Sequence, residues 1–277
     1  DHVVPRNMVE SILGNSFSDD EIIQAIRRMG GIYNGEDKNG LSISMPRWRF
    51  DILHPIDLVE EIAIGHGYDD LAYDVPKAPL TGIPRKDGHL RRRIRDGLQG
   101  LGLMQIQSLT LSNDDDQFNL VRWKPDGKIT RMTNPITTEH TILRQNILPG
   151  LLRLLAANRH HDLPQGVYEL GTVVFDHKNR ERFSFLVAEN SGGFASLRGR
   201  IQALMRDLGC KDWTLEAMKD GPWLEGRGAK IIVEGKVIGQ CGEIDPRVSE
   251  SFELNVPMSG AQIDIQELSE VIKDPVH

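Results

Sequence analysis

Apolar and polar positions near the start of the chain repeat at the spacing of an amphipathic helix. The stripe runs through residues 22–29, and Gly30 and Gly31 follow it as a stop signal. Ser18 stands before the stripe with Glu21 three residues later, the pattern of a capping box. We therefore predict a helix that begins just after Ser18.

The next segment changes to the period of a half-buried strand. Apolar and serine positions alternate over residues 41–45, after a turn signal at Asn39-Gly40. Asp57 then precedes a second apolar stretch, residues 58–64, and we expect it to cap that helix. Together these elements predict a small α+β unit.

The rest of the chain mixes long strands with apolar helices. Helical stripes occur at residues 90–101, 147–161 and 196–208. Strand patterns rich in β-branched residues occur at 103–111, 166–175, 182–189, 229–244 and 260–268, with a turn at Glu234-Gly235. These patterns predict an α+β fold in which helices pack on a mixed or antiparallel sheet.

A cluster of prolines and glycines separates the two regions. Residues 76–88 include Pro76, Pro79, Pro84, Gly82 and Gly88, a composition typical of a linker. We therefore predict domains at residues 1–75 and 89–277. Charge divides at the same place, because residues 1–75 contain six Lys or Arg and fourteen Asp or Glu.

Composition narrows the class of protein. The 277 residues are 39% hydrophobic and 26% charged, which is typical of globular proteins. No apolar run reaches the roughly 20 residues that span a bilayer. Two cysteines, Cys210 and Cys241, provide neither a disulfide framework nor a zinc site. We expect a cytoplasmic protein and, since the chain lacks an initial Met, a fragment of a longer one.

Four carboxylates lie within eleven positions: Asp51, Asp57, Glu60 and Glu61. Asp57 and Glu60 are explained by the start of a helix, where unpaired N–H groups favour negative charge. A salt bridge to Arg47 or Arg49 is a second explanation. A hard divalent ion is a third, because Mg²⁺ binds carboxylate oxygens. The residue types alone leave these alternatives open.

Six basic residues gather at the start of the second region: Arg85, Lys86, Arg91, Arg92, Arg93 and Arg95. They are consistent with a solvated helix face. They are also consistent with contacts to nucleic-acid phosphates, which release counterions, or with contacts to acidic groups of a partner protein.

The segment from Pro46 to Tyr68 resembles the signature of the B-five module of the phenylalanyl-tRNA synthetase β subunit family. The matching positions are Pro46, Arg49, Asp51-Ile52, Asp57-Leu58, Glu60-Glu61, Ala63 and Gly67-Tyr68. The resemblance implies that Asp51, Asp57, Glu60 and Glu61 bind a Mg²⁺ ion shared with the α subunit.

The remaining chain resembles the class II synthetase-like part of the same family. Residues 90–111 are similar to its first helix-and-strand motif, and residues 133–175 to the segment that contains the counterpart of its second motif. Residues 226–265 resemble its C-terminal part, in a form closer to archaeal and eukaryotic members. The family's N-terminal parts, including the editing domain, have no counterpart, so we expect a C-terminal portion.

The resemblance also implies that this domain lacks catalytic residues. Catalytic class II enzymes have an Arg-x-Glu in the second motif and an arginine in the third, which stabilise the transferring phosphate. The corresponding positions read Val167-Tyr168-Glu169 and Ser259 to Asp264. We expect this chain alone to be inactive.

The function that the resemblance implies is therefore that of a scaffold. The chain would support the catalytic α subunit of phenylalanine–tRNA ligase, which uses ATP to charge tRNA(Phe), in an α2β2 assembly. The alternative is a stand-alone, non-catalytic class II-like protein that acts in protein interaction or nucleic-acid binding. No membrane contact is expected in either case.

Overall fold

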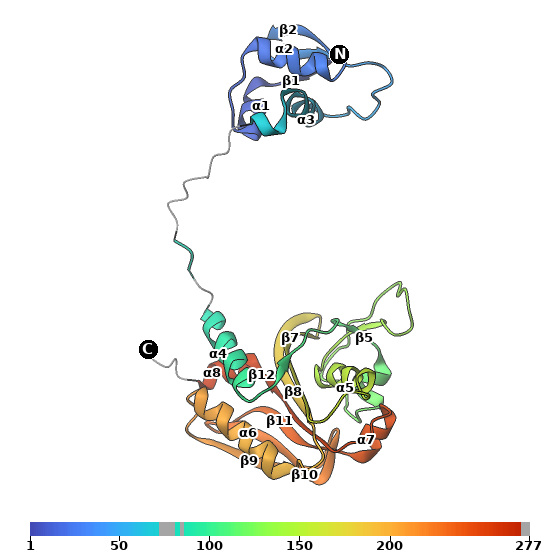
Figure 1. Ribbon diagram of the computed structural model, residues 1–277, viewed down its shortest axis with the longest axis vertical. Coiled ribbons are helices and arrows are strands. Elements are labelled where there is room, and N and C mark those ends of the chain that lie inside the picture. Colours follow the sequence, from blue (N-terminus) through green and yellow to red (C-terminus); the bar gives the residue numbers. More distant parts are fainter. Residues whose placement is uncertain (72–80, 84–85, 273–277) are drawn as a thin grey trace. The chain divides into compact units, whose positions relative to one another are not determined.

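The computed structural model describes residues 1–71, 81–83 and 86–272 (Figure 1). The chain divides into two compact units, Asp1–Thr81 and Gly82–His277. Residues 76–80 and 84–85 of the predicted linker lie outside the described residues, and residues 86–88 belong to a helix. Among the described residues, no helix combines the length and apolar character that a membrane span requires.

The first unit packs three helices on a three-stranded antiparallel sheet. Its strands are β1 (His2–Val4), β2 (Ile32–Asp37) and β3 (Gly40–Ser44), in the order β1-β3-β2. Its helices are α1 (Arg6–Leu13), α2 (Asp19–Arg28) and α3 (Pro55–His66), followed by the short 3-10 turn η1 (Tyr68–Asp70). The capping box between Ser18 and Glu21 is confirmed, with both hydrogen bonds present.

Helices α2 and α3 approach each other closely at Gly65. A Cβ at this position would lie 2.1 Å from the carbonyl oxygen of Ala25, so only glycine permits the contact. Arg28 donates from Nη1 to the carbonyl oxygen of Gly65 at 2.9 Å. Helix α3 is therefore seated on the core with its first turn beside the loop that follows β3.

The second unit is built on a seven-stranded sheet in the order β4-β7-β8-β12-β11-β10-β9. Only β4 runs parallel to its neighbour β7; the other pairs are antiparallel. These strands are β4 (Met104–Gln105), β7 (Gln165–Phe175), β8 (Lys178–Ala188), β9 (Trp213–Met218), β10 (Trp223–Val233), β11 (Lys236–Ile244) and β12 (Met258–Asp264).

Helices cover both faces of this sheet (Figure 1). One face packs against α4 (Lys86–Gly100), α6 (Phe194–Asp207) and α8 (Ile265–Val271). The other packs mainly against α5 (Leu148–Ala157) and α7 (Pro246–Ser251). The π-helix η2 (Asp115–Asn119) and a two-stranded ribbon of β5 (Leu111–Ser112) and β6 (Ile142–Leu143) lie in the long connection between β4 and α5.

Two strand predictions in this unit are wrong in extent. Residues 103–111 pair with β7 only at Met104–Gln105, because the chain then leaves the sheet edge. Strand β12 ends at Asp264, whose carboxylate accepts hydrogen bonds from the backbone N–H groups of Gln266 and Glu267 and so starts a helix. The turn at Glu234-Gly235 is confirmed, and both residues have positive φ.

Asp245 fixes the end of β11 to the start of α7. Its buried carboxylate accepts hydrogen bonds from the backbone N–H and guanidinium of Arg247, and from Nη1 of Arg122 at 2.8 Å. The hydrogen bonds from Arg247 lower the pKa of Asp245 from its ordinary 3.8 to about 2. The folded state therefore favours the ionised form.

We expect Asp245→Asn to lower the free energy of unfolding of the second unit by about 2 kcal/mol at neutral pH. Because the folded pKa is depressed, this stabilisation is complete above the ordinary value of 3.8 and is lost as the pH falls toward about 2. Urea unfolding of the wild type and of Asp245→Asn across this pH range measures the difference in free energy of unfolding. Asp207→Asn, at a more exposed aspartate, is the control. A difference that does not change with pH would contradict the prediction.

Candidate functional site

Arg49 lies at the centre of the carboxylate motif, in the loop between β3 and α3. It donates from Nε and Nη2 to Asp51 at 2.7–3.1 Å, and from Nη1 to Oε2 of Glu61 at 2.8 Å. Nη2 also donates to the second oxygen of Glu61. Both carboxylates thus receive charge-assisted, two-pronged hydrogen bonds. These bonds lower the pKa of Asp51 below its ordinary value.

Asp57 has a separate task at the start of α3. Its Oδ2 accepts hydrogen bonds from the backbone N–H groups of Leu53 and His54, each at 2.7 Å, and these lower its pKa. The helix begins at Pro55 and its N-cap is His54, so the prediction that Asp57 is the cap is wrong. Proline suits the first helical position because it lacks an N–H, and this places the start of the helix three residues earlier than predicted.

The four predicted magnesium ligands are therefore not gathered around one point. Asp51 and Glu61 meet at Arg49, Asp57 is bound to backbone N–H groups, and Glu60 is exposed. Among the described residues, no three His, Cys, Asp or Glu side chains are placed to hold a metal ion. As arranged in this chain, the four carboxylates do not fit a magnesium ion. The shared site stays a prediction of the resemblance.

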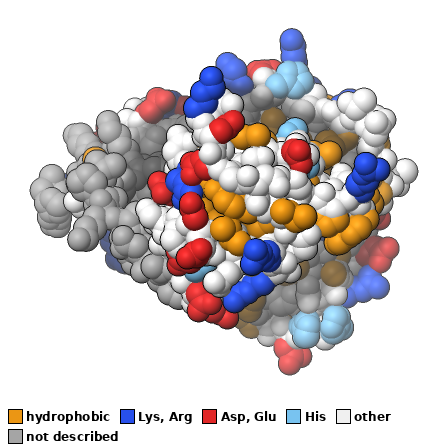
Figure 2. Space-filling model, turned by 90° about the horizontal axis from the view of Figure 1, so that it is seen from above, with side chains coloured by type: hydrophobic (Ala, Val, Ile, Leu, Met, Phe, Trp, Pro, Cys, Tyr) orange, Lys and Arg blue, Asp and Glu red, His pale blue; other side chains and the backbone are white. Residues whose placement is uncertain are grey.

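The same loop exposes several large apolar side chains. Trp48 is 67% exposed, Phe50 87% and Leu53 72%, whereas Ile52 between them is only 5% exposed. Ile52 belongs to the core of the first unit. Figure 2 shows exposed hydrophobic side chains beside acidic ones on the face in view. The loop is thus anchored by one buried side chain and its charges, while its aromatic side chains face solvent.

The basic cluster of α4 is partly used inside the second unit. Arg91 donates from Nε to Oε2 of Glu181 at 2.7 Å, and Arg93 donates to the carbonyl oxygen of Asp207. Arg92 is exposed and Arg95 is half-buried. Arg85 and the side chain of Lys86 lie outside the described residues. Of the four predicted contact residues whose side chains the structure describes, Arg92 is the one that is exposed.

A buried ion pair includes Glu169, the residue that the resemblance compares with the second class II motif. Glu169 of β7 accepts from Nη2 of Arg144 at 2.6 Å and from the hydroxyl of Ser108 at 2.6 Å. Arg144 also donates from Nη1 to Ser108 at 2.7 Å and from Nε to the carbonyl oxygen of Thr172 at 2.9 Å. The side chains of Arg144 and Glu169 are 5% and 1% exposed. A Cβ at Gly171 would lie 2.5 Å from Nη2 of Arg144, so this glycine makes room for the guanidinium.

Amide side chains continue this network toward β12. Gln262 accepts hydrogen bonds from the backbone N–H groups of Ile147 and Leu148 at 2.8 and 3.2 Å, and donates to Asn146 at 2.8 Å. Gln117 accepts from the backbone N–H of Asn146 at 2.8 Å. A helix N-terminus is otherwise well suited to bind an anion. Here the side chain of Gln262, in the segment compared with the third class II motif, already accepts the hydrogen bonds of the N–H groups at the start of α5.

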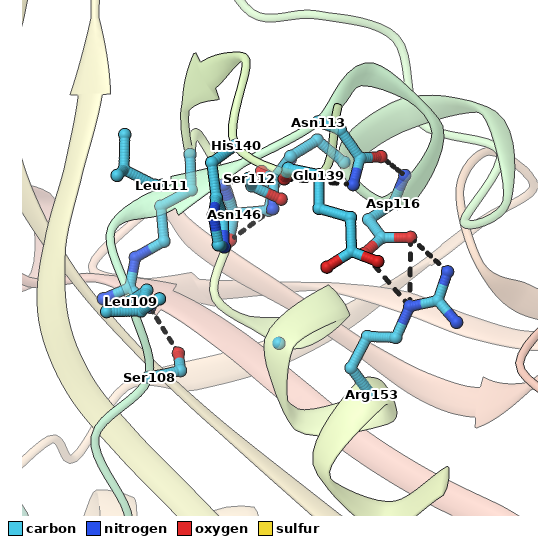
Figure 3. A pocket seen from close by; sticks show the side chains of 13 residues that line it. Ser108, Leu109, Leu111, Ser112, Asn113, Asp116, Glu139, His140, Asn146 and Arg153 are labelled. Carbon is cyan, nitrogen blue, oxygen red and sulfur yellow. Dashed lines mark hydrogen bonds and ion pairs between the residues drawn. The ribbon is translucent and has the colours of Figure 1, made fainter. Parts of the chain in front are cut away.

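A pocket of about 430 Å³ lies next to this network (Figure 3). Its lining includes Arg144 and the pair formed by Arg153 and Asp116, whose hydrogen bonds are drawn in Figure 3. Asp116 raises the pKa of Arg153, and both arginines are already neutralised by carboxylates. Both arginines that line the pocket are therefore already paired with carboxylates.

A second hollow, of about 330 Å³, lies over the sheet beside Arg182 of β8. Arg182 stacks 4.2 Å from the ring centre of Phe175 and donates from Nη1 to Asn146 at 3.0 Å. Burial lowers the pKa of Arg182. The lining contains three basic residues, Arg180, Arg182 and Lys230, and three acidic ones, Asp126, Asp264 and Glu267. These charges balance, so this hollow does not form a basic ATP site.

Arg144, Gln262 and Arg182 were not among the residues predicted to form a site. The signal that could have pointed to Arg144 is the charged and polar run of residues 144–146, directly before an apolar helix. Such a run at the start of a buried helix requires internal partners. Its partner Glu169 comes from a strand that only the tertiary fold brings close.

We expect the loss of one member of the buried pair to be costly. Arg144→Met or Glu169→Leu should lower the free energy of unfolding of the second unit by about 3–5 kcal/mol, because each leaves a buried charge without its partner. The double variant Arg144→Met/Glu169→Leu should cost much less than the sum of the two.

Denaturant unfolding measures these differences. The exposed pair Arg159–Glu253, whose side chains are 58% and 78% exposed, provides the control, and its loss should cost less than about 1 kcal/mol. Additive effects at Arg144 and Glu169 would show that the two charges are not coupled.

Solved structures support the fold of the second unit. Two structures of pyrrolysyl-tRNA synthetase from Desulfitobacterium hafniense each align with a TM-score of 0.55 over 66% of this chain. The alignments cover 68% and 67% of the two pyrrolysyl-tRNA synthetase chains, at 12% and 13% sequence identity. The likeness supports a class II synthetase-like α+β fold and nothing more specific.

Sequence relatives identify the family. The chain is 36% identical over 93% of its length to the phenylalanine–tRNA ligase beta subunit of Archaeoglobus fulgidus, and 32% identical over 95% to that of Methanothrix thermoacetophila. It spans 47% and 48% of those two proteins, about half their length. Residues 3–68 match the tRNA synthetase B5 domain, and residues 71–265 match the phenylalanyl tRNA synthetase beta chain CLM domain. The chain therefore belongs to the phenylalanyl-tRNA synthetase beta chain family.

Proposed function

We propose that this chain is the portion of a phenylalanine–tRNA ligase β subunit that supports the catalytic α subunit. The α subunit would use ATP and Mg²⁺ to activate phenylalanine and transfer it to tRNA(Phe), in a cytoplasmic α2β2 assembly. Family membership and the printed names of the relatives support this role.

The buried pair Arg144–Glu169 is the observation that carries the proposal. Adenylation brings two anions together and requires arginines that are free to bind them. Glu169 and Gln262, which the resemblance compares with the two motifs, are both committed to internal hydrogen bonds. A domain that keeps the synthetase fold but neutralises its own charges fits a supporting role better than a catalytic one.

We expect the chain to form a stable complex with the cognate α subunit in magnesium buffer. Light scattering after size exclusion should give the mass of two copies of each subunit, and aminoacylation should require the α subunit. If the two proteins never elute together, the chain is not sufficient for the subunit contact. A stand-alone interaction protein or nucleic-acid-binding protein would then be the better reading.

Arg92 tests the tRNA contact of the basic cluster. If it binds a phosphate in the complex, Arg92→Ala should reduce the slope of log affinity against log salt by about one for tRNA(Phe). Arg206→Ala, which removes an 81% exposed arginine from α6, is the control. An unchanged slope in both variants would assign the cluster to the solvated face or to a subunit contact.

A further inference from the structure

We propose that Arg49 serves as the cation of the carboxylate motif in this chain, joining Asp51 to Glu61 in the place that the family resemblance gives to a metal ion. The inference concerns the first unit alone and does not depend on the proposed subunit contact.

Both carboxylate oxygens of Glu61 already have a partner. Its side chain is 6% exposed, and both of its oxygens accept hydrogen bonds from Arg49. A magnesium ion demands carboxylate oxygens at short, fixed distances, so it would compete with the guanidinium for the same atoms. A divalent ion beside Arg49 would also be repelled by its positive charge.

Glu61 requires a cation whether or not a metal is present. A buried carboxylate without a partner is strongly destabilising. Glu61 lies on the same helix as the core residues Leu58 and Ile62, which are fully buried. Arg49 satisfies this need from within the chain. Its planar fork of donors makes paired hydrogen bonds to each of the two carboxylates, a geometry that a lysine ammonium does not provide.

The two other predicted ligands do not share this cation. Asp57 Oδ2 already accepts two backbone N–H groups, and a bound cation there would have to share that oxygen. Glu60 is exposed, whereas its neighbour Glu61 is buried. Only two of the four carboxylates therefore share a cation, and that cation is a guanidinium.

Arg49 is consequently a positioning residue for the loop of residues 47–54. Asp51 is held by Arg49, Leu53 and His54 are held by Asp57, and Ile52 is packed in the core. The Cζ atom of Arg49 also lies 5.9 Å from the ring centre of Trp48. These contacts keep Trp48 and Phe50 directed to solvent without a metal ion.

Hydrogen exchange of the 277-residue chain, followed by mass spectrometry over residues 47–61, tests the proposal directly. We expect the same exchange rates in excess magnesium chloride and in excess EDTA, and no heat of binding when magnesium is titrated into the metal-free chain. Faster exchange of this segment in EDTA would overturn the proposal, and this comparison requires no variant.

Variants then test whether Arg49 is the cation that holds Glu61. Arg49→Met should speed exchange of the loop roughly tenfold or more with or without magnesium, because Glu61 loses its partner. Arg49→Lys, which keeps the charge but not the fork, should fall between Arg49→Met and the wild type. Glu61→Gln should also speed exchange, whereas Glu60→Gln should match the wild type.

A dependence of these variants on magnesium would instead identify a metal site. If magnesium restores slow exchange in Arg49→Met, or if Glu60→Gln and Asp57→Asn each abolish a measurable magnesium affinity of the wild-type chain, the ion and not Arg49 holds the motif. The same reading applies if chelation dissociates a complex with the α subunit and Asp51→Asn has the same effect.

Discussion

Burying an arginine beside a carboxylate is the constraint on which both units depend. Taking two charges out of water costs several kcal/mol per ion, and the pair is tolerated only when nearly every donor and acceptor finds a partner. Arg144 meets this condition with Glu169 and Thr172 of strand β7 and with Ser108 of the connection that follows β4. The pair therefore fixes the connection before α5 onto strand β7.

The same constraint shapes the first unit on a smaller scale. Arg49 links a loop carboxylate to a buried helical one, and the exposure of the two differs greatly: the side chain of Asp51 is 55% exposed and that of Glu61 6%. The exposed end is screened by solvent and contributes little, so the buried contact with Glu61 dominates. Geometry, and not the number of acidic residues, decides which carboxylates of the motif matter for the fold.

Local patterns predicted most of the elements because those elements are determined by neighbours in the sequence. The capping box at Ser18, the turn at Glu234-Gly235 and the helix stripes depend on a few adjacent residues. The prediction of a strand over 103–111 is too long because the alternation of its residues continues after the chain has left the edge of β7. The start of α3 was misplaced because the N-cap preference of Asp57 was weighed without the stronger constraint of Pro55.

The candidate site was less predictable, for the reason that charge partners are tertiary. The spacing of residues 51–61 is consistent with a helix start, a metal ion or a salt bridge, and it cannot show that Arg49, only two residues before Asp51, is the partner of Glu61. Likewise, Glu169 looks like the remnant of a catalytic motif until Arg144 is seen beside it, 25 residues away in the chain. A domain can thus keep the strands of a synthetase while its charged side chains are turned inward. Because Arg144 and Glu169 neutralise each other, they stabilise the fold and are not free to bind anions, and this is the physical ground on which a supporting role is proposed for this chain.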